Sequence, residues 1–324
     1  NMRIMVRITT WLTAITLAMT AMVACEEEVD QEALRQEESR YFQLYMDTNY
    51  PDLEPQESGL YYINIEEGDG ATPDSGDYVL INYLAQTVPD GNVFDTYTEE
   101  FARQYNLYQE QVLYGPYKYQ HGSEMEGMRE GLSMMKEGGI ARLLFTSDLG
   151  FGADGFGQVE PFESLLYDIE LLEVIEQPAD REFEQMQNYL DTVENYTRIL
   201  DEDIDVVMYY IPDRIGEGDS IQSDDMIDIY YTGQLLDGRV FDSNTDEDSP
   251  LQVTLGEEEV IQGLELGLTY FRKGGEGRLL VPHPLGYGEE GSKVSRSNKT
   301  SVPPFEALLF HIEVLNPETT TAKK

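Results

Sequence analysis

Short runs of alternating apolar and polar residues, separated by turn dipeptides, recur along most of this 324-residue chain. Residues 227–231 alternate as a half-buried strand does, and residues 78–83 are rich in the β-branched and aromatic side chains that strands favour. The dipeptides Asp90-Gly91 and Asp237-Gly238 are typical of tight turns between antiparallel strands. The pattern therefore predicts a mainly antiparallel sheet.

One short segment within the strand-rich regions has a helical period instead. Val260, Ile261, Leu264 and Leu268 fall on one face of a helix, because their spacing follows its 3.6-residue turn. A sheet packed against one short helix belongs to the α+β class.

Two amphipathic stretches precede the strand-rich regions. The first lies within residues 26–58, and the second covers residues 179–197 and either packs on a domain or mediates dimerisation. The expected apolar faces are Leu34, Tyr41 and Tyr45 in the first stretch and Phe183, Met186, Leu190 and Val193 in the second.

The chain contains one block of sequence twice. Residues 90–96 read DGNVFDT and residues 237–243 read DGRVFDS, with the phenylalanines 147 positions apart (94 to 241). The correspondence continues upstream at 61–63 and 209–211, and downstream at 167–170 and 310–313. A repeat of this length indicates two whole domains, because solenoid repeats run about 20–50 residues.

The domain boundaries follow from these signals. Domain 1 is predicted at residues 59–177 and domain 2 at residues 207–317. An acidic helix with a linker, residues 25–58, precedes the first, and a connecting helix, residues 178–206, precedes the second. Residues 318–324 are predicted to form a disordered tail.

Residues 1–24 have the layout of a bacterial signal peptide. Arg3 and Arg7 precede an uncharged apolar stretch, residues 11–23, that is short for a membrane span. The small residues before Cys25 resemble a lipobox, which implies lipidation of Cys25 and a lipid-anchored protein of the cell envelope. The alternative is a plain signal peptide with a chance cysteine.

The chain is strongly acidic, with 63 Asp and Glu residues against 21 Lys and Arg and a formal net charge of −42. Such a field repels nucleic acid and anionic lipid head groups, so neither is expected as a partner. It would attract basic client proteins, although a heavily solvated surface is the plainer interpretation.

Several chemistries are excluded by the residues themselves. The histidines, His121, His283 and His311, are far apart and have no cysteine beside them, so no metal site is expected. Neither a glycine-rich phosphate loop nor a Gly-x-Ser-x-Gly nucleophile motif occurs. No cofactor is therefore expected.

Domain 2 carries a series of motifs in a definite order: residues 231–233 (YTG), 241–243 (FDS), 255–256 (LG), 260–263 (VIQG), 285–288 (LGYG), 302–304 (VPP) and 309–310 (LF). This order resembles the FKBP family of peptidyl-prolyl cis-trans isomerases over about residues 207–316. Residues 59–176 resemble the same family more weakly. The resemblance implies tandem domains, each an antiparallel half-barrel sheet wrapped on one short helix, and clients that are proline-containing polypeptides.

The resemblance also implies a site in domain 2. Tyr287 would offer its hydroxyl to a substrate carbonyl, the Ile261 N–H would serve another, and Asp242 would hold Tyr231 at the rim. Leu264 and Leu251 stand where the family usually has aromatic residues. The alternative is that these are ordinary core residues. The expected pocket walls are Tyr231, Phe241, Val260, Ile261, Leu264 and Phe310.

Domain 1 departs further from the family pattern. Phe151 takes the tyrosine position, so its hydroxyl is missing, and an insert at residues 99–117 is either a partner-binding flap or an ordinary loop. We expect this domain to bind chains and to isomerise poorly. The candidate residues in domain 1 are Tyr83, Phe94, Asp95, Met125, Met128, Phe151 and Tyr167.

In domain 2, the polar segment at residues 289–300 is expected to form an extended loop that lies over the site of that domain.

Two functions fit the sequence. The first is a prolyl isomerase and folding helper for exported proteins, active mainly through domain 2. Rotation about an imide bond makes and breaks no bond, so it needs only an apolar pocket and a few fixed donors. The second is a non-catalytic binding subunit of an outer-membrane secretion or assembly complex, because fold alone does not determine activity.

Overall fold

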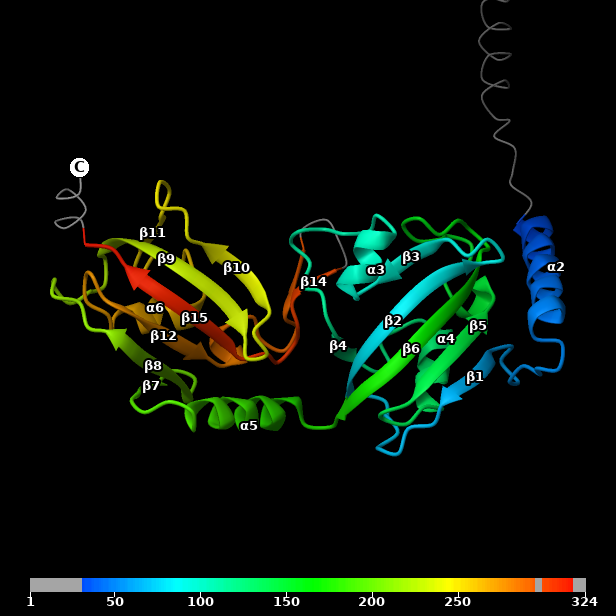
Figure 1. The fold of residues 1–324 in the computed structure, drawn as a ribbon, viewed down its shortest axis with the longest axis horizontal. Helices are drawn as coiled ribbons and strands as arrows, with labels where there is room; N and C mark the ends of the chain where they lie inside the picture. The colour runs from blue at the N-terminus through cyan, green and yellow to red at the C-terminus, as the bar shows by residue number, and fades with distance from the viewer. Residues whose placement is uncertain (1–30, 295–298, 317–324) are drawn as a thin grey trace, which may run out of the picture.

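A computed structural model describes residues 31–294 and 299–316 of the chain, which form two lobes side by side along its longest axis (Figure 1). The predicted signal peptide, Cys25 and the predicted tail at 318–324 lie outside these described residues. None of the helices in the described ranges is long and apolar enough to cross a membrane.

Domain 1 is built on an antiparallel sheet with the strand order β1-β5-β6-β2-β3, and β4 pairs with β2 beside it. The long central pair β2 and β6 carries the alternation of buried and half-exposed residues expected of a sheet with one face on a core. The strands are β1 (Tyr61–Glu66), β2 (Tyr78–Val88), β3 (Val93–Thr96), β4 (Tyr117–Gln120), β5 (Ile140–Phe145) and β6 (Ser164–Ile175).

Domain 2 repeats this topology with the order β10-β9-β15-β12-β8, and β11 pairs with β9. One strand more, β7, extends its edge beyond β8. The α+β fold of two tandem half-barrel domains is thus confirmed. The strands are β7 (Thr197–Asp201), β8 (Val206–Arg214), β9 (Met226–Leu235), β10 (Val240–Asn244), β11 (Leu251–Thr254), β12 (Glu276–Val281) and β15 (Leu308–Val314).

One short helix crosses each sheet, α4 (Glu126–Ser133) in domain 1 and α6 (Gln262–Leu268) in domain 2. Glycines let these helices lie close to the strands beneath them. A Cβ at Gly131 would stand 2.3 Å from Leu143 Cδ1, and one at Gly263 would stand 2.3 Å from Val281 Cγ1. The helix therefore packs closely against the sheet in each domain, because no helix side chain separates the two at these points.

A longer helix precedes each domain, α2 (Gln31–Asn49) and α5 (Pro178–Leu190). The helix α5 is shorter than expected, because β7 already occupies part of the predicted connecting segment. Figure 1 shows α2 at the outer end of domain 1 and α5 along the lower side between the lobes.

The predicted apolar faces of these helices are partly wrong. Tyr41 and Phe183 are 43% and 60% exposed. The buried rows are instead Glu38, Phe42 and Met46 in α2, and Glu182, Met186 and Leu190 in α5. Each buried row begins with a glutamate, and hydropathy alone does not assign a charged residue to a buried face.

Both buried glutamates have hydrogen-bond donors to satisfy them. Glu38 accepts hydrogen bonds from the Ser147 N–H at 2.6 Å, the Ser147 hydroxyl at 2.7 Å and the Ser164 hydroxyl at 2.8 Å. Glu182 accepts from the His283 N–H at 2.6 Å and is hydrogen-bonded to His283 Nδ1. Each helix is therefore tied to the start of a one-turn 3₁₀ helix, η1 (Ser147–Leu149) or η2 (His283–Leu285).

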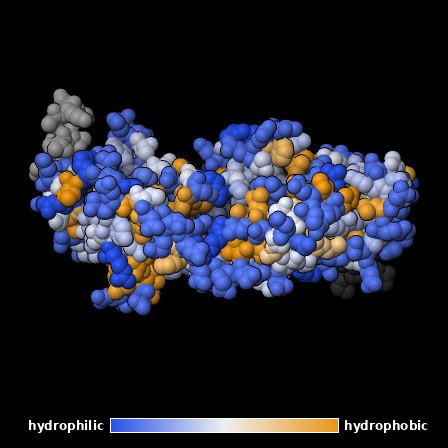
Figure 2. Space-filling model, turned by 60° about the horizontal axis from the view of Figure 1, so that its bottom comes forward, coloured by the Kyte–Doolittle hydropathy of each residue, from blue (hydrophilic) through white to orange (hydrophobic). Residues whose placement is uncertain are grey.

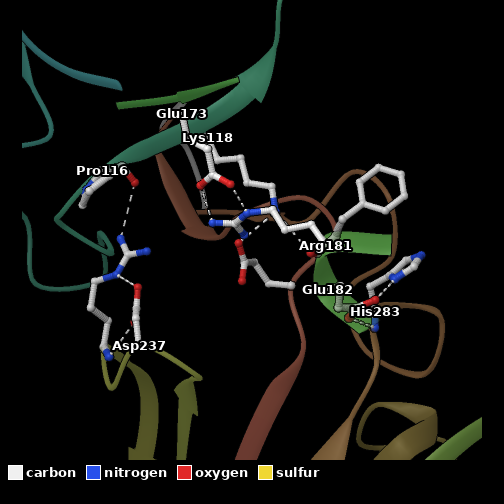
Figure 3. A network of polar contacts seen from close by, with 10 residues as sticks. Pro116, Lys118, Glu173, Arg181, Glu182, Asp237 and His283 are labelled. Atoms are coloured by element: carbon white, nitrogen blue, oxygen red, sulfur yellow. Dashed lines mark hydrogen bonds and ion pairs between the residues drawn. The ribbon is translucent and has the colours of Figure 1, made fainter. Parts of the chain in front are cut away.

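Polar contacts join the two domains (Figure 3). Lys118 of β4 is 1% exposed, and its ammonium donates to the Phe305 carbonyl at 3.1 Å and to Glu306 at 2.9 Å. On α5, Arg181 makes two hydrogen bonds of 2.7 Å to Glu173 of domain 1. Because Lys118 is buried, breaking its pair with Glu306 would leave an uncompensated charge, so this contact favours a fixed junction.

The insert of domain 1 takes part in the same junction. It contains the helix α3 (Glu99–Gln104), and Leu113 packs into the core cluster of domain 2. The guanidinium of Arg239 in domain 2 donates to the Tyr114 carbonyl at 3.3 Å. The insert therefore forms an interdomain contact, which an ordinary surface loop does not, and its role as a partner-binding flap stays a prediction.

The exterior matches the acidic composition. On the face drawn in Figure 2, hydrophilic residues cover most of the surface, and hydrophobic residues form smaller patches over both halves. This distribution fits a strongly charged, well-solvated exterior.

Candidate functional site

An aromatic cluster lies on the face of domain 2 where three chain segments meet. The ring of Phe241 in β10 stands edge-to-face against Phe310 of β15, with centroids 5.6 Å apart, and against Tyr287, at 6.1 Å. Gly233 of β9 lies opposite Phe310 in register, and a Cβ there would stand 2.7 Å from the Phe241 ring. The glycine is needed because a side chain would occupy the space of both rings.

The rim of this cluster is polar. The hydroxyl of Tyr231 donates a 2.6 Å hydrogen bond to Asp242. Burial, followed by the hydrogen bond to Asp242, raises the pKa of Tyr231 above its usual value. Tyr231 therefore stays neutral, and its hydroxyl continues to donate the hydrogen bond to the Asp242 carboxylate. This bond fixes the position of the Tyr231 ring, whose centroid lies 6.4 Å from that of the Phe310 ring.

The helix side of the cluster comes from the start of α6. Ile261 is the residue that caps this helix, in an extended conformation (φ −60°, ψ 152°), and Leu264 is buried one turn later. Val260 and Ile261 are half-buried against the same core cluster. The N–H of Ile261 precedes the first helical turn, where backbone donors have no partner within the helix. It is thus suited to hold a ligand carbonyl.

Tyr287 is presented by the 3₁₀ turn that Glu182 holds. The Gly288 N–H donates to the His283 carbonyl at 2.8 Å, and Gly288 adopts a φ of +69° that favours glycine. Burial raises the pKa of Tyr287 above its usual value, so its hydroxyl remains a donor throughout the neutral range.

Domain 1 repeats this geometry with other side chains. Tyr83 donates a 2.7 Å hydrogen bond to Asp95, as Tyr231 does to Asp242. Phe94 stands edge-to-face against Tyr167 at 6.0 Å and against Phe151 at 6.2 Å. The arrangement of rings is kept, while the hydroxyl of Tyr287 has no counterpart on Phe151.

A cavity of about 630 Å³ opens beside this cluster in domain 1. Four predicted residues line it, Tyr83, Phe94, Asp95 and Phe151. Met125, Met128 and Tyr167 are not among its lining residues, and Met128 and Tyr167 are buried. The lining residues that the sequence did not single out are Tyr97, Gln109, Tyr117, Phe156, Gly157, Gln158 and Lys299.

Two of these lining residues, Gln109 and Tyr117, belong to the insert at residues 99–117, and the many tyrosines and glutamines of that insert are the sequence feature that could have pointed to them. Tyr97 lies just before the insert, and its ring stacks on that of Tyr117 with the centroids 4.3 Å apart. Phe156 and Gln158 follow no local pattern that marks a site, and Lys299 belongs to a segment that the sequence assigned to the site of domain 2.

The expectation for residues 289–300 is corrected by the structure. In their described part, Val294 packs on the core cluster of domain 1 and Lys299 lines the domain 1 cavity. The segment reaches the neighbouring domain because the two domains are fixed side by side through Lys118 and Arg181, an arrangement that no local pattern encodes.

The arrangement suits a reaction that needs no nucleophile. The described residues contain no group of three or more His, Cys, Asp and Glu that could hold a metal ion. An apolar pocket with a few fixed donors favours a twisted, less polar amide over the planar one. The cluster in domain 2 supplies the corresponding groups, three packed rings with the Tyr287 hydroxyl and the Ile261 N–H beside them.

Comparison with known proteins adds independent findings. A family model described as FKBP-type peptidyl-prolyl cis-trans isomerase matches residues 70–172 and 218–315, more than half of the chain. A probable FKBP-type peptidyl-prolyl cis-trans isomerase of Haemophilus influenzae is 38% identical over 110 residues, which are 34% of this chain and 42% of that protein. The chain thus spans less than half the length of this relative.

Two further similarities each cover less than half of this chain. FK506-binding protein 1 of Saccharomyces cerevisiae is 36% identical over 106 residues, which are 32% of this chain and 88% of that protein. The crystal structure of a peptidyl-prolyl cis-trans isomerase from Pseudomonas syringae pv. tomato covers 46% of this chain and 98% of its own, with 25% identity and a TM-score of 0.37.

Proposed function

Because this chain belongs to the family of FKBP-type peptidyl-prolyl cis-trans isomerases, we propose that it catalyses prolyl isomerisation and that domain 2 carries most of the activity. The observation that supports this assignment is the edge-to-face cluster of Phe241, Tyr287 and Phe310 beside the Tyr231–Asp242 hydrogen bond. The proline ring would enter between the aromatic side chains. Tyr287 and the Ile261 N–H would hold the flanking carbonyls while the imide rotates.

For domain 1 we propose a chain-binding role with little catalysis. Its cavity of about 630 Å³ falls in the range of ligand sites, but Phe151 offers no hydroxyl to a rotating carbonyl. Binding without a donor at this point stabilises the ground state and the twisted state alike, and uniform binding does not raise kcat.

The clients and the location of the protein are also proposals. The signal-like residues 1–24 and the lipobox-like context of Cys25 support a lipid-anchored protein of the cell envelope that assists exported, proline-containing polypeptides. The second candidate, a non-catalytic subunit of an outer-membrane complex, is favoured by the missing hydroxyl of domain 1.

The test is prolyl exchange of a short X-Pro peptide, measured by NMR with the full chain and two double variants. Phe241→Ala with Asp242→Ala removes a ring and the carboxylate of domain 2, and we expect kcat/KM to fall at least about tenfold, since each substitution removes contacts worth about 1 kcal/mol or more. The matched double variant of domain 1, Phe94→Ala with Asp95→Ala, should leave most of the activity in place.

Two results would speak against this assignment. A large loss in the domain 1 double variant alone would move the activity to the other site. No exchange above background by the folded wild-type chain would leave the non-catalytic subunit, and co-purification of the chain with membrane proteins would then identify its complex.

A further inference from the structure

A hairpin of domain 2 reaches the cavity of domain 1. It is formed by β13 (Ser292–Lys293) and β14 (Thr300–Val302), and the Val294 N–H donates to the Lys299 carbonyl at 2.8 Å. Figure 1 shows β14 between the lobes, close to the insert of domain 1. We call the described residues 292–294 and 299–302 the arm.

The arm is attached to domain 1 by several hydrogen bonds. The Thr300 N–H donates to the Tyr97 hydroxyl at 2.8 Å, and that hydroxyl lies 3.3 Å from the Thr300 hydroxyl. The Leu113 N–H donates to the Thr300 carbonyl at 3.1 Å. These bonds involve backbone groups on both sides, so they position the arm relative to the cavity wall.

The arm delivers one cation to the cavity. The Lys299 ammonium is hydrogen-bonded to Asp95, donates to the Thr96 carbonyl at 2.9 Å and lies 4.3 Å from the centre of the Tyr97 ring. The Lys299 side chain is 15% exposed and that of Asp95 is 30% exposed. An ion pair at this depth is screened less by solvent than one on the open surface.

The lysine changes the charge that a ligand meets. The carboxylate of Asp95 already accepts the Tyr83 hydroxyl, and without Lys299 it would give the cavity a negative charge within a chain of net charge −42. A site of that kind selects cations. With Lys299 in place the pair is neutral, and the remaining lining is aromatic or carries uncharged amides, as in Gln109 and Gln158.

We infer that the domain 1 cavity is a peptide-binding site shared by both domains, in which Lys299 sets the specificity toward uncharged or acidic segments around a proline. The inference rests on the proposed chain-binding role of domain 1. Lys299 acts as a specificity-determining residue because it compensates the carboxylate, while the rings of Phe94 and Phe151 provide the apolar surface.

The test compares three blocked pentapeptides with a central Phe-Pro pair, preceded by Glu, Gln or Lys. Each is titrated into the full chain at one ionic strength, and the ¹³C-labelled methyl signals of Met125 and Met128 report occupancy. Met128 belongs to the buried core cluster of domain 1 that includes Tyr83, and Met125 and Phe94 pack against that cluster, so the two methyl signals distinguish this site from that of domain 2.

We expect Lys299→Met to shift the ratio of Kd values for the Lys and Glu peptides by about fivefold in favour of the Lys peptide, the size of one partly screened charge interaction. Lys299→Arg keeps the cation and should keep the wild-type ratio. The matched control is Lys293→Met, which removes an exposed cation from the same hairpin and should also leave the ratio unchanged.

An unchanged ratio in Lys299→Met would overturn the inference, as would an equal shift in Lys293→Met, which would indicate a general effect of charge. If no peptide moves the methionine signals of the wild-type chain, the shared site itself is refuted. Prolyl exchange measured in the same sample then shows separately whether the proposed isomerase function stands.

Discussion

At the scale of single residues, the two domains differ at the position where we propose that domain 2 donates a hydroxyl to the substrate. Tyr287 and Phe151 occupy equivalent places against Phe241 and Phe94, at 6.1 and 6.2 Å, so the ring packing is the same in both. The hydroxyl is the difference. Its contribution can therefore be measured without disturbing the pocket, because a phenylalanine at 287 reproduces a geometry that the chain already uses.

We expect Tyr287→Phe to lower the kcat/KM of prolyl exchange by about three- to tenfold with little change in stability, since one neutral hydrogen bond is worth about 0.5–1.5 kcal/mol. Exchange NMR on the full chain gives the rate, and chemical denaturation gives the stability. Tyr270→Phe removes an exposed hydroxyl from the same domain and serves as the control. An equal loss in both variants would argue against a role for the Tyr287 hydroxyl.

At the scale of elements, the helix before each domain is part of the frame of its site. Glu182 on α5 holds the start of η2, four residues before Tyr287, and Glu38 on α2 holds the start of η1, four residues before Phe151. The partners differ, a histidine in one domain and serines in the other, but the buried carboxylate is the same. In both domains, a buried glutamate on the preceding helix thus holds the start of the 3₁₀ turn.

Replacing Glu182 by Gln should destabilise domain 2 by about 1–3 kcal/mol, because charge-assisted hydrogen bonds to His283 become neutral ones inside a buried site. It should also lower kcat more than it raises KM, since the turn carrying Tyr287 loosens. Denaturation followed by methyl NMR measures the stability of each domain separately. Glu38→Gln is the matched control, and it should destabilise domain 1 while domain 2 keeps its kcat.

If Glu182→Gln lowered stability but left kcat and KM unchanged, the glutamate would hold the helix without positioning Tyr287. That outcome would restrict its role to folding and would contradict the proposed link between α5 and the site.

At the scale of the whole molecule, the domains differ in how many tyrosines they bury. Burial raises the pKa values of tyrosines in both domains above the usual value near 10, but more of them lie in domain 1. In domain 2 the raised group includes Tyr210, which is buried, and the half-buried Tyr231 and Tyr287. The tyrosines with raised pKa in the core of domain 1 are Tyr83, Tyr97, Tyr117, Tyr119 and Tyr167.

Domain 1 should therefore unfold first at alkaline pH. A tyrosine whose folded pKa lies above its unfolded pKa contributes its full stability below about pH 10 and loses it as the pH rises from there toward the folded value. Denaturation at pH 8 to 11.5, followed through the methyl signals of Met128 for domain 1 and Met208 for domain 2, measures the order. Loss of the Met208 signal first, or of both at one pH, would contradict this account.

The sequence by itself determined the class, the tandem repeat and the aromatic residues of both clusters. Strand alternation, the turn dipeptides and the block around Phe94 and Phe241 are local patterns, and local patterns specify which elements form and which residues they carry. The cluster of domain 2 could be anticipated because its residues follow one another in a recognisable order.

Only the tertiary structure decided the contacts between distant segments. Asp95 and Lys299 are 204 positions apart, and their pairing depends on how two finished domains lie against each other. The buried glutamates escaped prediction because a carboxylate is buried only where donors from another segment, such as the N–H groups of Ser147 and His283, meet it. Periodicity describes one element at a time, whereas these contacts arise from the packing of several.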